Sequence, residues 1–387
     1  MLLLRQARAQ LAAAPLHLPV LHHLAEILWG MGRRCRVLVG WRENGECAEM
    51  KRVLLCLGVV ALCSCGASEE TVIRPVLMFT IRTETGLDAP RDLAVDDSGN
   101  ILVFDYDDYT IHEFTPSGEV LATFGGPEGE AGGFRHLMAI RALGDDVLAL
   151  DAGALSIFDS SGQLRATRAF SDTIICDHPR LHPNGEWAGE WIVEETAEKV
   201  LTYRDASGLQ LSRVAGFALD EFFPGIQPGG MFFIKPTQLR SYVYDFSPDG
   251  RLVWAVSDQA RIFRVGDQDD SPLFSADWHP RPFPATEIQA LQEQQASLNP
   301  PLFMNVPRSY QLIQHLLVDE SGDIWIYVTS VERTGLVHLS DQGVEKGFHA
   351  VEADFDLLSV RVAAAHGRFY FMAGERDATG IFVADRP

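Results

Sequence analysis

The clearest signal in this sequence is residues 88–134, which read DAPRDLAVDDSGNILVFDYDDYTIHEFTPSGEVLATFGGPEGEAGGF. Four runs of β-forming residues, at 91–96, 100–105, 110–115 and 119–125, are separated by Asp-Asp-Ser-Gly, Tyr-Asp-Asp and Pro-Ser-Gly. Asp, Gly and Pro supply the backbone geometry that tight hairpin turns need. The stretch therefore predicts a four-stranded antiparallel sheet, of the kind that forms one blade of a β-propeller.

Weaker copies of this pattern continue to the C-terminus. They cover 135–170, about 172–215, about 239–277, 311–350 and 357–385, and the fifth copy is closest to the first: LVDESGDIWI at 317–326 against AVDDSGNILV at 94–103. The sixth copy has only three strands, and an unpaired run near 75–83 can supply the fourth, which would cover two free sheet edges. Residues 74–387 are thus predicted to form an all-β, six-bladed β-propeller with four-stranded blades. Five or seven blades are the alternatives.

Two insertions interrupt the repeats. One is Phe217–Pro236, rich in Phe, Gly and Pro, and the other is Asp277–Arg308. Within the second, Thr286 with Gln289 three residues later matches a capping box and predicts one short helix from Glu287 to about Ala296. Long ordered loops often carry binding surfaces, so we expect a ligand or partner role for one of them. The alternative is that both simply cover one face.

The N-terminal part has a different composition. Residues 50–64 combine Met50, two basic residues and the apolar run Val53–Cys63, which is typical of a signal peptide and too short to span a membrane. Residues 1–49 are then an upstream extension or a mis-assigned start, and the alternative is an Arg-rich organelle transit peptide. Residues 65–73 are predicted to be a polar tether.

The end of the signal peptide, Leu-Cys-Ser-Cys at 62–65, resembles a bacterial lipobox. This resemblance implies that Cys65 carries a lipid, which would anchor the protein without a spanning helix. The alternative is an ordinary signal peptide with two incidental cysteines. Gly66 follows Cys65, where Asp usually marks retention in the inner membrane, so the expected location is the bacterial cell envelope, at the outer membrane facing the periplasm or exterior.

A second resemblance rests on the repeats. Residues 90–105, PRDLAVDDSGNILVFD, resemble the core of an NHL repeat, and FGGPEGEAGGF at 124–134 is similar to a connection in bacterial six-bladed propeller lipoproteins. The resemblance covers roughly 75–387 and is clearest in copies one, two and five. It implies a secreted, often lipid-anchored propeller, usually without an assigned activity.

Charge and cysteine content limit the classes of partner. The chain carries a formal net charge of −21, and residues 1–64 are net basic, so the predicted mature protein is more acidic still. Such a surface repels phosphate backbones, which argues against nucleic acid binding. Beyond the predicted cleavage point only Cys65 and Cys176 remain, so we expect no internal disulfide and a buried Cys176 thiol. The protein is expected to be a monomer.

Candidate site residues come from aligning the copies on their turn glycines. The residue seven positions before that glycine opens the innermost strand, which faces the central channel, and it is Asp92, His178, Val243, His315 or Val360. Basic residues stand at or beside these positions in other copies. The predicted ring at the channel entrance comprises Arg91, Asp92, Arg135, His136, His178, Arg240, His315 and Arg361.

This ring has three interpretations. It is a solvated entrance, an anion site in which the arginines hold a carboxylate or a sugar acid, or a metal site for Ca or Zn in which His136, His178 and His315 are the candidate ligands. No cofactor is firmly implied, and no nucleophile elbow, phosphate-binding loop or dinucleotide motif is present. The sequence favours a module that binds a ligand, protein, peptide or glycan. A metal-dependent lyase or lactonase-type enzyme and a purely structural envelope protein are the alternatives.

Overall fold

The computed structural model describes residues 71–82, 87–129, 132–144, 146–193, 196, 198–218, 240–267, 271–297, 309–355, 357, 360–375 and 378–387. The predicted upstream extension, the signal peptide, Cys65 and the start of the tether lie outside these residues. Most of the insertion Phe217–Pro236 and the end of Asp277–Arg308 also lie outside them. No helix of the described part is long and apolar enough to cross a bilayer.

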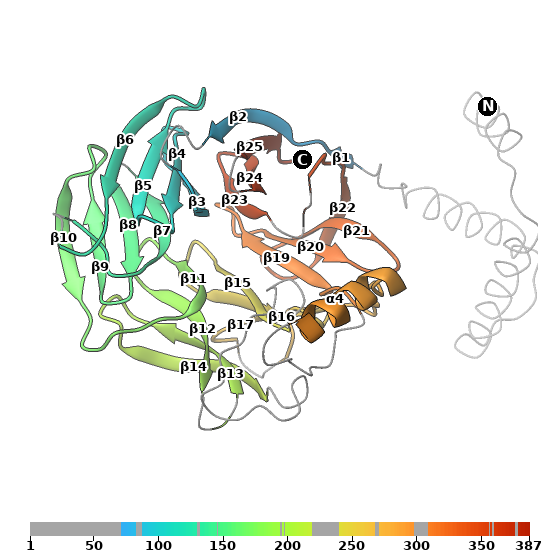
Figure 1. The fold of residues 1–387 in the computed structure, drawn as a ribbon. Helices are drawn as coiled ribbons and strands as arrows, with labels where there is room; N and C mark the ends of the chain where they lie inside the picture. The colour runs from blue at the N-terminus through green and yellow to red at the C-terminus, as the bar shows by residue number, and fades with distance from the viewer. Residues whose placement is uncertain are drawn as a thin grey trace, which may run out of the picture. The chain divides into compact units, whose positions relative to one another are not determined.

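The described strands form six sheets arranged in a ring, and four strands of each sheet pair antiparallel (Figure 1). Blade one contains β3(Pro90–Val95), β4(Ile101–Asp105), β5(Thr110–Phe114) and β6(Val120–Gly125). Blade two contains β7(Leu137–Leu143), β8(Asp146–Asp151), β9(Ala154–Phe158) and β10(Leu164–Ala169). Blade three contains β11(Asp177–Leu181), β12(Trp187–Val193), β13(Glu198–Arg204) and β14(Gln210–Ala218).

The remaining blades complete the ring. Blade four contains β15(Tyr242–Phe246), β16(Leu252–Val256), β17(Arg261–Arg264) and β18(Phe274–Ser275). Blade five contains β19(Ile313–Val318), β20(Ile324–Thr329), β21(Thr334–Leu339) and β22(Glu345–Val351). Blade six contains β23(Arg361–Ala365), β24(Arg368–Glu375), β25(Ala378–Asp385) and β2(Val76–Arg82). The innermost strands β3, β7, β11, β15, β19 and β23 contact one another in that order, and β23 contacts β3, so the predicted six-bladed propeller is confirmed.

The predicted closure of the last blade by an N-terminal strand is also confirmed. Strand β2 pairs antiparallel with β25, with Val76 opposite Val383 and Arg82 opposite Ala378. Ile81 is 2% exposed and belongs to a buried cluster that includes Leu93 of blade one and Tyr370 of blade six. The strand therefore joins both ends of the chain to one sheet and also supports the neighbouring blade.

One strand was not predicted. Strand β1(Thr71–Ile73), at the end of the predicted tether, pairs parallel with the outer strand β22 of blade five. The Ile73 side chain is buried, and its carbonyl accepts a hydrogen bond from the Glu352 amide at 3.0 Å. Three residues are too few to show an alternating pattern, so this pairing depends on tertiary contacts that the sequence does not display.

The repeated turns are built by their own acidic residue. In blade five, Asp319 Oδ1 accepts hydrogen bonds from the Ser321 amide at 2.8 Å and the Asp323 amide at 3.1 Å. Gly322 follows in the left-handed region, with φ of 86°. Asx-type bonding of this kind explains why the Asp-x-Ser-Gly pattern recurs in turns. The motif is therefore part of the architecture.

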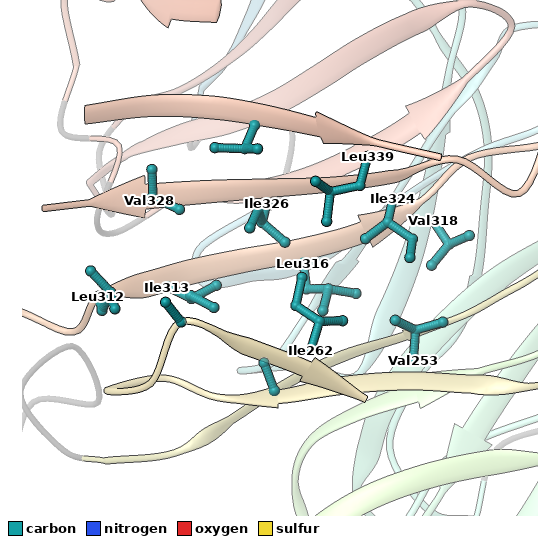
Figure 2. Packing of buried hydrophobic residues seen from close by; sticks show 13 residues of the cluster. Val253, Ile262, Leu312, Ile313, Leu316, Val318, Ile324, Ile326, Val328 and Leu339 are labelled. Atoms are coloured by element: carbon teal, nitrogen blue, oxygen red, sulfur yellow. The ribbon is translucent and has the colours of Figure 1, made fainter. Parts of the chain in front are cut away.

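Apolar clusters between neighbouring blades form the core. Figure 2 shows one of them, in which Val253 and Ile262 of blade four face Leu316 and Ile324 of blade five. Ile262 is fully buried. Burial of one such side chain stabilises the fold by about 1.5–3 kcal/mol, so each interface between blades contributes strongly to the closed ring.

The inserted helix is present, with different bounds. Helix α4(Ala285–Ser297) begins two residues before the predicted start, and the Ile288 amide bonds the Pro284 carbonyl at 3.2 Å. Thr286 thus lies inside the first turn and does not cap the helix, because Pro284 already ends the preceding segment. Cys176 is buried and unpaired, as predicted.

Candidate functional site

A cavity of about 470 Å³ lies at one end of the central channel. Its walls come from the innermost strands of blades one, three, four, five and six and the segments that precede them, together with parts of β24 and β25 of blade six. Such strands start at the same end of a propeller because every blade runs outward from the channel. Four predicted ring residues line this cavity: Arg91, His178, His315 and Arg361.

Three arginines converge on the cavity. Arg91 and Arg361 were predicted, and Arg180 of β11 joins them. Arg361 donates its Nε–H to the Arg91 carbonyl at 2.9 Å, while the Arg91 guanidinium lies 4.5 Å from the centre of the Tyr106 ring. Burial lowers the pKa of Arg361 to about 10; Asp92 opposes this shift, and Arg180 and Arg91 add to it. The site thus collects like charges and has strong positive potential.

His178 occupies an unusual backbone conformation beside these arginines. Its φ is 48°, in the left-handed region that a non-glycine residue rarely adopts. Its carbonyl accepts a hydrogen bond from the Tyr244 hydroxyl at 2.8 Å, and its Nδ1 lies 3.8 Å from Glu190 Oε1. Burial lowers the pKa of His178 to about 3, and the positive charge of Arg361 acts in the same direction. The imidazole is therefore neutral at physiological pH.

Glu190 lies directly behind His178 and is completely buried. Its Oε2 accepts hydrogen bonds from Lys199 Nζ at 2.8 Å and from the Tyr242 amide at 3.3 Å. Burial raises the pKa of Glu190, and the Lys199 ammonium opposes that rise. Glu190 Oε1 has no hydrogen-bond partner among the described residues, so one carboxylate oxygen remains available toward His178.

His315 lines the same cavity from blade five. Its Nε2 lies 3.1 Å from the Leu357 carbonyl. Burial lowers the pKa of His315 to about 4; the hydrogen bond to Leu357 opposes this, and Arg361 and Arg180 reinforce it. Two neutral imidazoles thus stand among three guanidinium groups in this cavity.

Asp92 has a structural role that the sequence did not reveal. Its Oδ2 accepts a hydrogen bond from the Ile140 amide of blade two at 3.2 Å. Asp245 does the same between blades four and five, where it accepts from the Val318 amide at 2.9 Å. Asp92 also lines a second cavity of about 530 Å³ toward the other end of the channel, instead of the first. Arg180 lines both cavities, and its Nη1 lies 3.9 Å from Asp92 Oδ1.

Three other members of the predicted ring lie away from the lining of the first cavity. Arg135 is exposed and pairs with Glu128 at 3.0 Å. The His136 ring lies edge-on to Tyr106, at 5.4 Å between ring centroids. Arg240 forms an ion pair with Asp258 at 3.2 Å. In blade two the turn glycine, Gly144, follows β7 directly and does not stand at the aligned position. Arg240 stands three positions away from the aligned position in blade four, so the alignment could not place these side chains.

The predicted histidine metal site is not assembled. His136 does not line the cavity that His178 and His315 share. Within the described ranges, no group of three or more His, Cys, Asp or Glu side chains has an arrangement suited to a metal ion. The predicted set combined histidines by their position in the repeat, but the His136 ring packs against Tyr106 of blade one instead of lining the cavity.

Arg180 was not among the predicted site residues, although its position in the repeat is unusual. The position five before the turn glycine is Ala94, Leu317 and Val362 in three blades, but Arg180 in blade three and Asp245 in blade four. A charged residue where most copies carry an aliphatic one marks a departure from the packing role of that position. Only the position two residues earlier was used for the alignment.

No protein-family model and no curated protein matches this chain. Among solved structures, it is similar to a putative exported protein from Bacteroides fragilis, with 11% identity, a TM-score of 0.46, and coverage of 83% of this chain and 98% of that one. It is also similar to virginiamycin B lyase from Staphylococcus aureus, with 11% identity, a TM-score of 0.41, and coverage of 79% and 98%. Regucalcin from Agrobacterium tumefaciens gives 13% identity, a TM-score of 0.39, and coverage of 82% and 97%. At these values we draw nothing about ligands or activity from the neighbours.

Proposed function

We propose that this propeller is a binding module whose channel cavity holds a small organic anion. The observation that carries the proposal is the convergence of Arg91, Arg180 and Arg361 on one cavity. Asp92 lies 3.9 Å from Arg180 and offsets part of this charge, but it is one carboxylate beside three guanidinium groups. The Glu190 carboxylate behind His178 is paired with Lys199, and Asp88 lines the cavity as an exposed residue.

Guanidinium groups favour carboxylate and phosphate ligands because their planar N–H donors can bind two oxygens at once. The cavity also presents apolar atoms from Val243, Leu316 and Met372. Its volume of about 470 Å³ falls in the usual range for small-molecule sites. Together these features favour a carboxylate attached to several carbon atoms over a bare inorganic ion.

The experiment is isothermal titration of purified protein with a panel of carboxylic acids, repeated with two variants. Arg361→Ala removes a cavity guanidinium, and Arg368→Ala removes an exposed one on the next strand, where Arg368 pairs with Asp385 at 3.1 Å. We expect Arg361→Ala to weaken binding at least tenfold and Arg368→Ala to leave it unchanged. Equal binding by both variants would remove the cavity as the site.

We propose further that the propeller is an NHL-type lipoprotein anchored through Cys65 in a bacterial cell envelope. The support is the lipobox-like sequence at 62–65 and the basic and apolar residues before it. Mass analysis of the native N-terminus and membrane fractionation of a Cys65→Ser variant test this proposal. Detection of residues before Met50 in the native protein, or unchanged membrane association of the variant, would contradict it.

A further inference from the structure

Two imidazoles line the cavity, and in one of them, His315, a ring nitrogen is engaged in a hydrogen bond. His315 Nε2 lies 3.1 Å from the Leu357 carbonyl, and a carbonyl oxygen only accepts, so Nε2 is the donor. In the neutral ring, the lone pair then stands on Nδ1. Among the described residues, no group donates a hydrogen bond to that Nδ1. His315, whose side chain belongs to a residue that lines the cavity, therefore carries one acceptor for which the described residues supply no donor.

His178 offers a second acceptor. Its Nδ1 lies 3.8 Å from Glu190 Oε1, which is longer than a hydrogen bond, and that buried oxygen has no hydrogen-bond partner among the described residues. In either neutral tautomer, one ring nitrogen of His178 carries a lone pair that can accept a hydrogen bond. The strained backbone of His178, held through its carbonyl by the Tyr244 hydroxyl, is the kind of conformation that concentrates at functional sites.

The cavity thus offers two kinds of polar group to a ligand. Arginine side chains only donate hydrogen bonds, whereas the two imidazoles accept them. A simple carboxylate would pair with the arginines and give the imidazole acceptors no hydrogen bond, so it would gain less binding free energy than a ligand that also donates to them. An ammonium group could donate to the imidazoles, but the three guanidinium charges repel it. A hydroxyl group donates without carrying charge.

From this complementarity we infer that the ligand is a hydroxycarboxylate. Its carboxylate binds among Arg91, Arg180 and Arg361, and its hydroxyl groups donate hydrogen bonds to His178 and His315. This inference rests on the proposed anion-binding function and adds the class of anion to it.

A series of six-carbon probes tests the two ideas separately. Gluconate and galactonate carry a carboxylate and hydroxyl groups, hexanoate carries the carboxylate alone, and sorbitol and galactitol carry hydroxyl groups without charge. Titration of the wild-type protein should show that gluconate or galactonate binds about tenfold more tightly than hexanoate, the difference expected for one or two extra hydrogen bonds. The polyols should not bind measurably.

Each result has a distinct meaning. Equal affinity for hexanoate and both hydroxy acids would overturn the hydroxycarboxylate inference and leave the anion-binding function standing. Failure of all three acids to bind, or binding of the polyols as tight as that of the acids, would overturn the anion-binding function and this inference with it.

A pair of variants then locates the hydroxyl contact. His315→Phe removes the acceptor and keeps a ring of similar size, whereas His315→Asn places an amide oxygen near the position of Nδ1. The Phe variant should lose the preference for hydroxy acids, so that gluconate and hexanoate bind it with similar affinity, and the Asn variant should keep most of the preference. An unchanged preference in a folded Phe variant would exclude His315 from hydroxyl recognition. If the Phe variant does not fold, the wild-type series still decides the inference.

Discussion

Arg361 of blade six donates its Nε–H to the Arg91 carbonyl of blade one across 2.9 Å, and this contact joins the innermost strands of the last and first blades. It brings together two arginines that were predicted from the first and last blades of the propeller. Strand β2 thus closes the ring at the outer edge of blade six, and the Arg361–Arg91 hydrogen bond connects the first and last blades beside the channel. A site that exists only after closure depends on the whole propeller being folded.

Replacing Arg361 by Met tests whether this residue serves binding or stability. A partly buried guanidinium among like charges is costly, and an apolar side chain of similar size is often neutral or stabilising at such a position. We expect Arg361→Met to abolish anion binding and to change the free energy of unfolding by less than about 1 kcal/mol. Urea denaturation measures this change. A loss of several kcal/mol would assign Arg361 a mainly structural role.

Replacing Lys199 by Met tests the buried pair behind His178. Removal of one partner of a buried ion pair typically costs about 3–5 kcal/mol, because the other charge remains without compensation. Lys199→Met should therefore destabilise the protein strongly, and adding Glu190→Gln should restore most of the loss. Denaturation of the two single variants and the double variant completes the cycle. Simple additivity of the two substitutions would contradict the pairing of Lys199 with Glu190.

The six-bladed fold could be predicted from the sequence because the residues that form its turns lie close together in the chain. Each turn is built by residues within five positions, such as Asp319 with Ser321 and Asp323, and these leave a visible repeat. The fourth strand of blade six could be inferred because the sixth copy has only three predicted strands and one predicted strand near the start of the propeller has no partner. Strand β1 could not, since three residues carry no pattern and the burial of Ile73 depends on blade five.

Only part of the candidate site could be predicted from the sequence. His178, His315, Arg91 and Arg361 lie where the repeat alignment places the channel, so they were found. Arg135 and His136 were assigned by analogy in the one blade that lacks a turn glycine at the aligned position. Glu190 could not be found, because its place behind His178 depends on the pairing of β12 with β11 and on a bulge between Asp177 and Arg180.

Truncation of β2 side chains tests the closure of the ring. Ile81 is 2% exposed, whereas Leu77 on the same strand is 51% exposed. Ile81→Ala removes buried apolar surface and leaves a cavity, which should lower the free energy of unfolding by about 2–5 kcal/mol. Leu77→Ala is the matched control and should cost less than about 0.5 kcal/mol. Comparable losses would mean that β2 does not hold the last blade through its buried face.

Acidification provides the last test, through His315. Burial lowers its pKa to about 4, with Arg361 and Arg180 adding to the shift, so the unfolded chain binds a proton at pH values where the folded protein does not. The contribution to stability is then complete above about pH 6.5 and falls by about 1.4 kcal/mol per pH unit as the pH drops toward 4, below which both states are protonated. His178, whose pKa is lowered to about 3, adds a similar slope.

Urea denaturation of wild type and His315→Asn between pH 7 and 4 isolates the effect, because other titrating groups contribute equally to both. The stability of the wild type should fall more steeply than that of the variant, and parallel curves would show that His315 is not held neutral by its surroundings.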